Sequence, residues 1–309
     1  HWIILMPTVR LTENDKDWAF VGVIPADAKG VTYIYGRQSC DTRSMEEGDI
    51  DDGNAKYAGQ EALMILERVF IPWDKVFMHG EYEYASMLIE RFTCYHRRSY
   101  VCKTGLGDVL IGAAATIADY NGVPNVSHIK DKIVEMTHLN ETIFAAGIAS
   151  SHLAHKLKSG VYLNEDMLAQ VCKHNVTRFP YEISRLAQDI AGGLVVTLPS
   201  EKDFRHPVAG PLLKRFLVGR KGVDVENRMR ILRLIENMTL GRNSVGYLTE
   251  SMHGAGSPQA QRIQMQRQMQ IGYKKNLAKK LAGITNDIEE PSEPSGYFNR
   301  IFQTKESIL

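Results

Sequence analysis

The stretch HIKDKIVEMTHLNET, residues 128–142, indicates how most of this chain folds. Its apolar side chains recur three or four residues apart, at Ile129, Ile133, Met136, Leu139 and, just beyond, Ile143. That spacing gathers them on one face of an α-helix. The segment 231–238 has the same pattern. From about residue 81 the sequence therefore predicts a helical bundle, with roughly five long helices up to residue 284.

Toward the N-terminus the pattern becomes that of β-strands. Segments rich in β-branched, aromatic and other apolar residues lie at 2–6, 18–24, 31–35 and 66–72. The turn-like composition of residues 25–30 predicts a hairpin between the second and third of these strands. Strands followed by helices define an α+β order.

Helix start and stop signals divide the helical part further. Asn164 is a candidate N-cap, and Ser257 precedes a proline that suits the first turn of a helix. Gly122 and the pair Gly192-Gly193 are expected to end helices. We expect a Pro/Gly-rich connection over residues 199–224.

Composition is that of an ordinary folded protein. The 309 residues are 44% hydrophobic, and 37 Lys and Arg against 36 Asp and Glu leave a net charge of +1. This balance gives no electrostatic reason to expect nucleic acid or an anionic membrane as a partner. The longest uncharged apolar run, 109–118, is shorter than the roughly 20 residues that span a bilayer. With no visible signal peptide, we expect a cytoplasmic protein.

The four cysteines are too few and too scattered for a disulfide framework. We interpret Cys40 and Cys172 as free thiols in a reducing compartment. The chain begins at His1 rather than at Met and enters an apolar stretch at once. We therefore expect it to be a piece of a longer protein.

The densest group of chemically capable side chains is RFTCYHRRSYVCK, residues 91–103. Its thiols and imidazole are the ligand types of iron–sulfur and zinc sites. No CxxC pair is present, so a cluster held here would need ligands from elsewhere in the protein. The alternative is a basic helix end with incidental cysteines.

A second candidate is TESMHGAGSPQ, residues 249–259. Gly254 and Gly256 would let the backbone approach a ligand, close to the N–H groups of the next helix. Glu250 and His253 would then be acid–base groups. A helix–helix turn with a structural Glu explains the same residues equally well.

Two weaker candidates remain. The run QDIAGG, residues 188–193, is either a plain helix end or a glycine pair against the pyrophosphate of a cofactor. Glu61, just before an apolar strand, is most simply a solvated loop acid.

Six long motifs run through the chain. They are YIYGRQSCDTR (33–43), AGQEAL (58–63), ERFTCYHRRSYVCKTGLGDVLIGAA (90–114), HIKDKIVEMTHLNET (128–142), VTRFPYEISRLAQDIAGGL (176–194) and YLTESMHGAGSPQAQR (247–262). Through them nearly the whole sequence closely resembles the 4-hydroxybutyryl-CoA dehydratase family, within the 4-hydroxyphenylacetate 3-monooxygenase group. The resemblance implies an acyl-CoA dehydrogenase-like fold, in which an N-terminal helical domain, a middle β domain and a C-terminal helical bundle enclose FAD. This chain would supply part of the middle β domain (1–80), the bundle (81–286) and a tail (287–309).

The resemblance also implies cofactors and partners. The family's dehydratase holds FAD and a [4Fe–4S] cluster with three cysteine ligands and one histidine ligand. His96 and Cys102 match two of these ligands, and the other two belong to the N-terminal domain that this chain lacks. Gly192 and Gly193 resemble the glycine pair that meets the FAD of a neighbouring subunit, which implies a homotetramer. The substrate would be an acyl-CoA.

The implied reaction is the dehydration of 4-hydroxybutyryl-CoA to crotonyl-CoA, with isomerisation of vinylacetyl-CoA. His96 would be a cluster ligand and a candidate base. Tyr100, Glu250 and Glu61 would transfer protons or position the substrate, and Lys103 would bind or polarise it. The alternatives are an FAD-dependent aromatic monooxygenase component, which needs no cluster, and a non-catalytic truncated product.

One departure from the family pattern bears on the cluster. The family reads HRxSYGGC, whereas this chain reads HRRSYVC and is one residue shorter. On a continuous helix, seven residues would leave His96 and Cys102 about 20° apart around the axis, and six leave them roughly 120° apart. We therefore expect ligation by Cys102 to depend on a break in the backbone.

Overall fold

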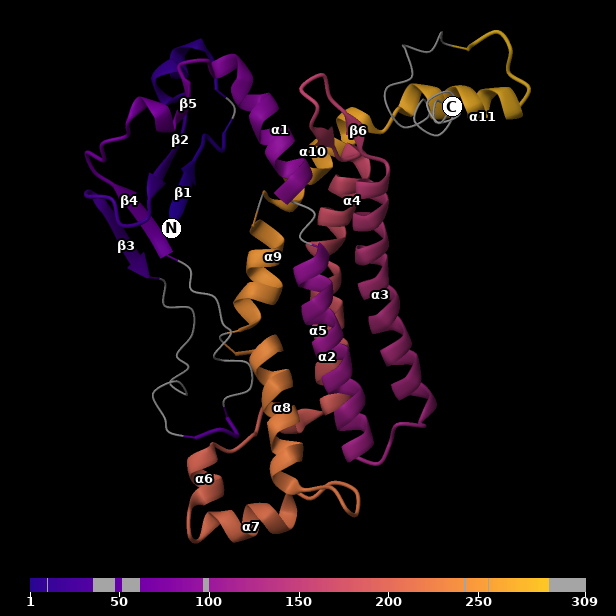
Figure 1. The fold of residues 1–309 in the computed structure, drawn as a ribbon. Coiled ribbons are helices and arrows are strands. Elements are labelled where there is room, and N and C mark those ends of the chain that lie inside the picture. The colour runs from indigo at the N-terminus through magenta and orange to yellow at the C-terminus, as the bar shows by residue number, and fades with distance from the viewer. Residues whose placement is uncertain are drawn as a thin grey trace.

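A small β region lies beside a long bundle of helices in the computed structural model (Figure 1). The structure describes residues 1–9, 11–35, 48–51, 62–96, 100–241, 243–254 and 256–288, without the side chains of Thr93, Tyr95 and His96. Strands come first and helices follow, which confirms the expected α+β order.

The β region consists of two small antiparallel sheets. One sheet has the order β1-β2-β5, from β1 (Trp2–Leu5), β2 (Phe20–Pro25) and β5 (Val76–His79). The other pairs β3 (Val31–Tyr35) with β4 (Ala62–Leu66). The short helical turn η1 (Glu13–Trp18) lies between β1 and β2, η4 (Trp73–Lys75) lies between β4 and β5, and η5 (Tyr82–Tyr84) leads from β5 to the first helix.

The predicted hairpin between the second and third strands is wrong. β2 is buried at Val21 and Ile24 and pairs on both sides, with β1 (Ile3 opposite Ile24) and with β5. A central strand has no free edge left for β3, which pairs with β4 instead. The strand expected over residues 66–72 is also misplaced, since β4 ends at Leu66.

The bundle is built from helices of 11 to 26 residues. They are α1 (Ala85–His96), α2 (Tyr100–Tyr120), α3 (Ser127–His152), α4 (Asp166–Val176), α5 (Phe179–Ala191), α8 (Val225–Thr239), α10 (Pro258–Gln268) and α11 (Ile271–Leu281). Shorter elements are β6 (His155–Lys156), β7 (Tyr162–Leu163), η6 (Gly193–Val195), α6 (Glu201–Arg205), α7 (Ala209–Phe216), the π-helical turn η7 (Val245–Thr249) and α9 (Glu250–His253).

Helix ends follow the sequence signals in most places. Ser257 caps α10, and its side chain accepts a hydrogen bond from the N–H of Ala260. Gly192 ends α5 with φ +78°, a conformation that favours glycine. Glu165 rather than Asn164 caps α4, because the Glu165 carboxylate accepts from the N–H of Leu168 at 2.6 Å. The helical part is divided more often than expected, and the 199–224 connection contains α6 and α7.

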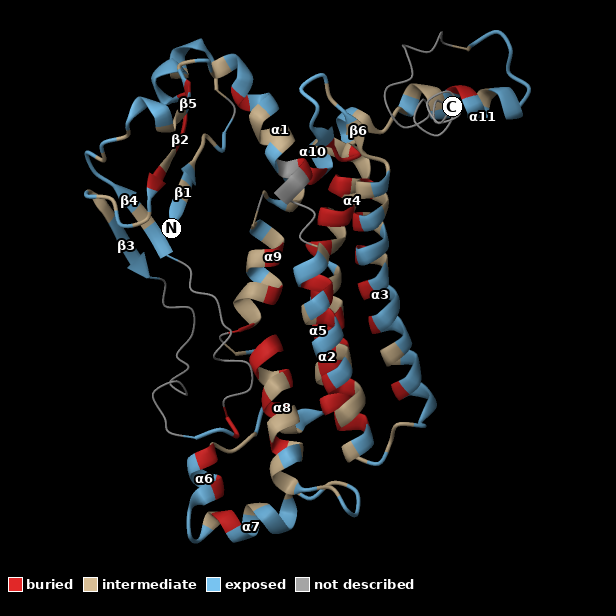
Figure 2. Cartoon of the chain, viewed as in Figure 1, coloured by how far each residue is buried: buried red, intermediate tan, exposed pale blue. Residues whose placement is uncertain are grey.

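The main core lies where α2 packs against α3, α5 and α8 (Figure 2). Leu110, Ala114 and Ile117 of α2 are completely buried there. Each large apolar side chain buried in this way contributes about 1.5–3 kcal/mol. By length and composition alone α2 could cross a membrane, but a core helix passes the same test, and its buried residues form this core.

A buried polar clasp ties residues 48–51 to the bundle. The Glu201 carboxylate accepts from the N–H of Ile50 at 2.7 Å and of Asp51 at 3.2 Å. In return, the Asp51 carboxylate accepts from the N–H of Glu201 at 2.6 Å and from Arg233 Nε at 2.8 Å. The side chains of Asp51 and Arg233 are about nine-tenths buried. Four residues between two stretches outside the described part are thus fixed to α6 and α8.

Breaking this clasp should destabilise the chain. Asp51→Ala removes the closer of the two carboxylates that pair with Arg233, leaving Glu236 at 3.3 Å, and takes the acceptor from the N–H of Glu201. We therefore expect the free energy of unfolding to fall by about 1–3 kcal/mol in chemical denaturation. The matched control, Glu182→Ala, removes the carboxylate of the exposed Glu182–Arg185 pair and should change stability little. Equal losses in the two variants would contradict the role given to the clasp.

Candidate functional site

Two of the motifs meet at an ion pair between Lys103 and Glu250. Lys103 lies in the first turn of α2, and Glu250 is the first residue of α9. The ammonium Nζ of Lys103 lies 2.6 Å from Glu250 Oε2 and donates to the carbonyl of Gly246, also at 2.6 Å. The Lys103 side chain is 8% exposed and that of Glu250 is 40% exposed. A buried cation is therefore held by a carboxylate that solvent or a ligand can still reach.

A π-helical turn shapes the acidic side of this pair. η7 carries Gly246 and leads directly into α9, so the wide turn places the Gly246 carbonyl and the Glu250 carboxylate around one ammonium. Tyr247, in the same turn, is buried in the main core, and burial, followed by the charge of Asp108, raises the pKa of its phenol. π-Turns inside α-helices often mark functional sites.

Tyr100, the first residue of α2, packs toward α3. Its ring lies directly against Gly147, where a Cβ would overlap it, and stands edge-on to Phe144 at 5.7 Å between centroids. One turn further on, the Asn140 amide of α3 donates to the carbonyl of Thr104 at 3.1 Å. These contacts fix the start of α2, and with it Lys103.

The contacts described above concern Lys103, Glu250 and Tyr100, and three acid–base candidates remain: Glu61, His96 and His253. Glu61 lies outside the described residues, as does the side chain of His96. His253 ends α9 next to Gly254. Their roles remain predictions.

His96 and Cys102 lie on either side of the junction between α1 and α2. α1 ends at His96 and α2 begins at Tyr100, with residues 97–99 outside the described part. The two residues therefore belong to different helices, and their rotation about one axis is not defined. The Cys102 thiol is exposed at the start of α2.

Cys94 belongs to a junction of three helices. Its thiol donates to the Asp166 carboxylate at the start of α4, which also accepts from Gln268 Nε2 of α10 at 2.8 Å. The pKa of Glu90, one turn earlier in α1, is raised by burial and then by the charge and hydrogen bond of Asp166. Cys94 is 1% exposed, so we interpret it as structural.

The glycine pair lies elsewhere in the fold. Gly192 caps the end of α5, and Gly193 begins η6, which leads toward α6. A Cβ at either position would meet nothing within 4 Å in this chain. Packing inside the chain therefore leaves the backbone open there, which fits a group that approaches it from outside.

The described residues do not by themselves form a binding site for an iron–sulfur cluster. No three His, Cys, Asp or Glu residues of the described ranges are grouped as metal ligands. The exposed Cys102 fits a ligand shared with another part of the protein, but the described side chains do not complete a ligand set. These side chains therefore support no reaction step through a cluster.

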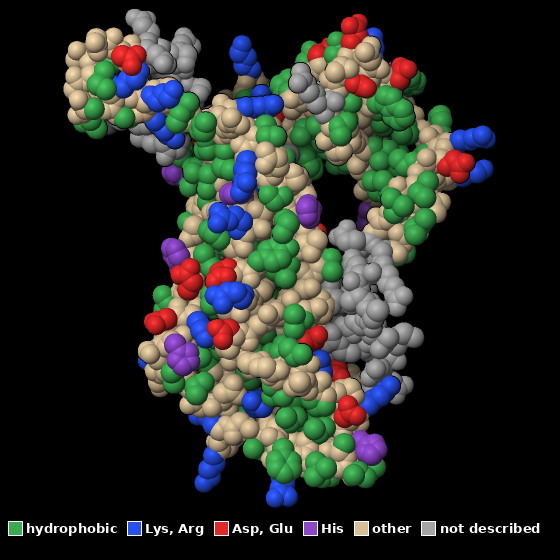
Figure 3. Space-filling model, turned by 180° about the vertical axis from the view of Figure 1, so that it is seen from behind, with side chains coloured by type: hydrophobic (Ala, Val, Ile, Leu, Met, Phe, Trp, Pro, Cys, Tyr) green, Lys and Arg blue, Asp and Glu red, His purple; other side chains and the backbone are tan. Residues whose placement is uncertain are grey.

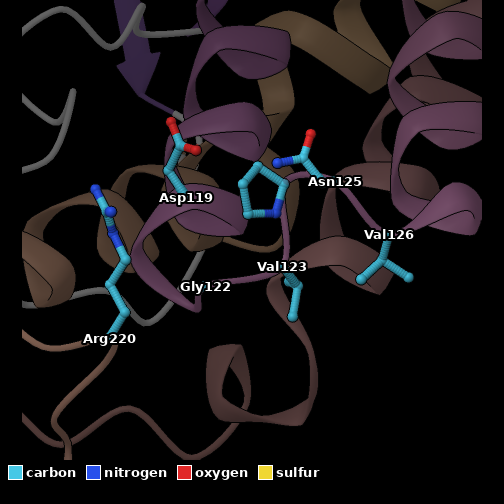
Figure 4. Close-up of a pocket in the computed structure, with 7 residues that line it drawn as sticks. Asp119, Gly122, Val123, Asn125, Val126 and Arg220 are labelled. Atoms are coloured by element: carbon cyan, nitrogen blue, oxygen red, sulfur yellow. The ribbon is translucent and has the colours of Figure 1, made fainter.

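Two hollows lie apart from the ion pair. One of about 390 Å³ lies at the α2–α3 turn, with Asp119 and Arg220 on one side and Val126 on the other (Figure 4). Asp119 follows Lys103 by 16 residues, or about 24 Å along α2. The other, of about 540 Å³, lies between α4, α10 and α11. Figure 3 shows a further opening between the β region and the bundle, and in Figure 1 α9 stands on the side of the bundle toward that region.

The fold and the motifs identify the family. The model of the 4-hydroxyphenylacetate 3-hydroxylase C-terminal region matches residues 85–283, and that of its N-terminal region matches residues 1–78. The chain belongs to this family. It is 89% identical to the oxygen-tolerant archaeal 4-hydroxybutyryl-CoA dehydratase of N. maritimus, with a TM-score of 0.96 over 99% of this chain and 61% of that chain.

Two other relatives place the chain within the family. It is 55% identical over 294 residues to the 4-hydroxybutyryl-CoA dehydratase/vinylacetyl-CoA-Δ-isomerase of Clostridium aminobutyricum. This match covers 92% of this chain and 60% of that protein. The oxygenase component of 4-hydroxyphenylacetate 3-monooxygenase shares the fold, with a TM-score of 0.80 at 20% identity over 91% of this chain and 60% of that chain. The resemblance to the family and the α+β fold class are confirmed, and the chain spans about 60% of the length of these relatives.

The three described cysteines should differ in reactivity. Cys102 is exposed, whereas Cys94 and Cys172 are buried, so we expect iodoacetamide to modify Cys102 at least about 10-fold faster in the native chain. Peptide mass spectrometry measures the three rates, and labelling in denaturant is the control that should equalise them. Labelling of Cys94 as fast as that of Cys102 would contradict the junction described above.

Glu90 should make stability depend on pH. Its folded pKa lies above the ordinary value of 4.5, so its charge destabilises the fold at pH 7, and the penalty disappears as pH falls toward 4.5. We expect Glu90→Gln to raise the free energy of unfolding at pH 7 by less than about 1 kcal/mol, since Glu90 is partly exposed. The gain should shrink near pH 4.5.

Chemical denaturation at the two pH values measures the effect of Glu90→Gln. The matched control is Glu182→Gln, because Arg185 lowers the pKa of Glu182 by a hydrogen bond. Since this pair is exposed, the control should be no more stable than the parent at pH 7, with a loss of less than about 0.5 kcal/mol. A Glu90→Gln variant that is less stable than the parent at pH 7 would refute the assignment.

Proposed function

We propose that this chain is part of an enzyme that dehydrates 4-hydroxybutyryl-CoA to crotonyl-CoA, one water being lost per turnover, and that isomerises vinylacetyl-CoA. The observation that carries the proposal is 89% identity over 99% of the chain to a solved 4-hydroxybutyryl-CoA dehydratase. The Lys103–Glu250 pair adds a chemical reason, because it joins two of the motifs in one partly open site.

The reaction needs protons moved at carbons beside and beyond the thioester carbonyl. Glu250 is suited to hold and return such a proton, since its carboxylate is 40% exposed and anchored at one oxygen by Lys103. Lys103 itself is fixed by Gly246 and Glu250. A rigid ammonium of this kind can bind and polarise a carbonyl oxygen that reaches it.

The cofactor part of the proposal rests on the family resemblance. FAD, when bound, would take up and return an electron, and the open backbone at Gly192 and Gly193 would approach it. A [4Fe–4S] cluster with His96 and Cys102 as ligands remains a prediction of that resemblance. We also propose, on the same ground, an acyl-CoA substrate and a homotetramer, and, from the composition of the sequence, a cytoplasmic location.

The test places this chain in the corresponding segment of the N. maritimus dehydratase. The chimera should form crotonyl-CoA from 4-hydroxybutyryl-CoA. An inactive chimera with intact fold and cofactors would contradict the proposal. Hydroxylation of 4-hydroxyphenylacetate with reduced FAD and oxygen would instead support the monooxygenase alternative.

Substitution of Glu250 separates catalysis from folding in that chimera. Glu250→Gln keeps the size of the side chain but removes its basicity, so we expect kcat to fall about 10²-fold or more. Glu182→Gln, an exposed change on α5, should leave kcat unchanged. Near-normal turnover of Glu250→Gln would make Glu250 a structural residue.

A further inference from the structure

Lys173 is a buried lysine on the apolar face of α4. It is 1% exposed and is among the largest fully buried side chains of the described residues. Ala169, Cys172 and Val176 of the same helix are completely buried. Burying a cation is costly, and an apolar side chain of similar volume can fill such a position without that cost. The charge therefore points to a task other than packing.

One contact of Lys173 indicates this task. Its Nζ donates to the carbonyl of Ser251 at 2.5 Å. α9 ends at His253, so this carbonyl is one of the last four of the helix, which have no partner within the helix itself.

This contact belongs to a network that surrounds Glu250. The hydroxyl of Ser251 donates to the Gly246 carbonyl at 3.1 Å, the same carbonyl that accepts from Lys103. Lys103 of α2 and Lys173 of α4 thus hold the two ends of the segment 246–251. Glu250 lies within this segment and is paired with Lys103.

We propose that Lys173 is a positioning residue for Glu250: by holding the Ser251 carbonyl it fixes the η7–α9 segment so that the carboxylate meets Lys103. η7 is a wide five-residue turn that leads directly into the four residues of α9, and the hydrogen bonds from Lys103 and Lys173 attach this segment to α2 and α4. Small misplacements of an acid–base group lower turnover steeply. The catalytic part of this inference rests on the proposed function.

The experiment compares variants in the chimera. Lys173→Met removes the donor and the charge at similar volume, and we expect kcat to fall about 10- to 100-fold with KM within about 2-fold. Lys173→Arg keeps the charge and the donor and should recover kcat to within about 5-fold of the parent. Lys132→Met is the matched control, because it removes a lysine paired with Asp189 elsewhere in the bundle, and it should leave kcat unchanged.

Hydrogen–deuterium exchange distinguishes positioning from general stability. In Lys173→Met we expect exchange to rise in peptides covering 245–254 and to stay unchanged in α5. Parental kcat together with parental exchange in 245–254 would overturn the inference. An equal rise throughout α5 would also overturn it, because it would show a general structural role.

A second variant covers the case in which Lys173→Met does not fold, and the exchange measurement covers the case in which the chimera is inactive. If Lys173→Met does not fold, Lys173→Gln replaces it, since that variant removes the charge and shortens the side chain that reaches the Ser251 carbonyl but keeps a polar end. We expect its kcat to be about 3-fold lower with faster exchange in 245–254, and no change in either would reject the inference. If the unsubstituted chimera does not dehydrate 4-hydroxybutyryl-CoA, the proposed function fails, while the exchange comparison still decides whether Lys173 positions the segment.

Discussion

The packing of α2 is the constraint on which the site depends. Its middle is buried against α3, α5 and α8, and its first turns are fixed to α3 by the Tyr100 ring on Gly147 and by the Asn140 amide on the Thr104 carbonyl. A helix fixed over this length cannot rotate or slide. Lys103 is therefore presented to the η7–α9 segment at one defined place.

The segment that meets Lys103 is irregular, and its order comes from outside. It consists of a π-helical turn and a four-residue helix, and Lys103 and Lys173 make three hydrogen bonds to it from neighbouring helices. Both lysines are buried, and burying charge is costly unless it is paired. We interpret the two buried lysines as the groups that keep Glu250 oriented while its carboxylate stays accessible.

The relatives share this framework at very different degrees of identity. The oxygenase component keeps the fold at 20% identity, while the N. maritimus dehydratase keeps it at 89%. A fold retained at 20% identity does not specify a reaction, because reactions depend on particular side chains. For this chain, the proposed reaction rests on the high identity and on the Lys103–Glu250 pair.

The sequence by itself determined the α+β order, the helical faces of α3 and α8, the cap of α10 and the family, because these depend on local periodicity, local hydrogen bonds and long motifs. Only the tertiary structure decided which strands pair, since β2 could have paired with β3. It also decided that Lys103 reaches Glu250 across 147 residues. The sequence shows Lys173 as a lysine on an apolar helix face. It does not show that this lysine donates a hydrogen bond to the Ser251 carbonyl. Every residue has a carbonyl, so only three-dimensional packing selects which one a buried lysine meets.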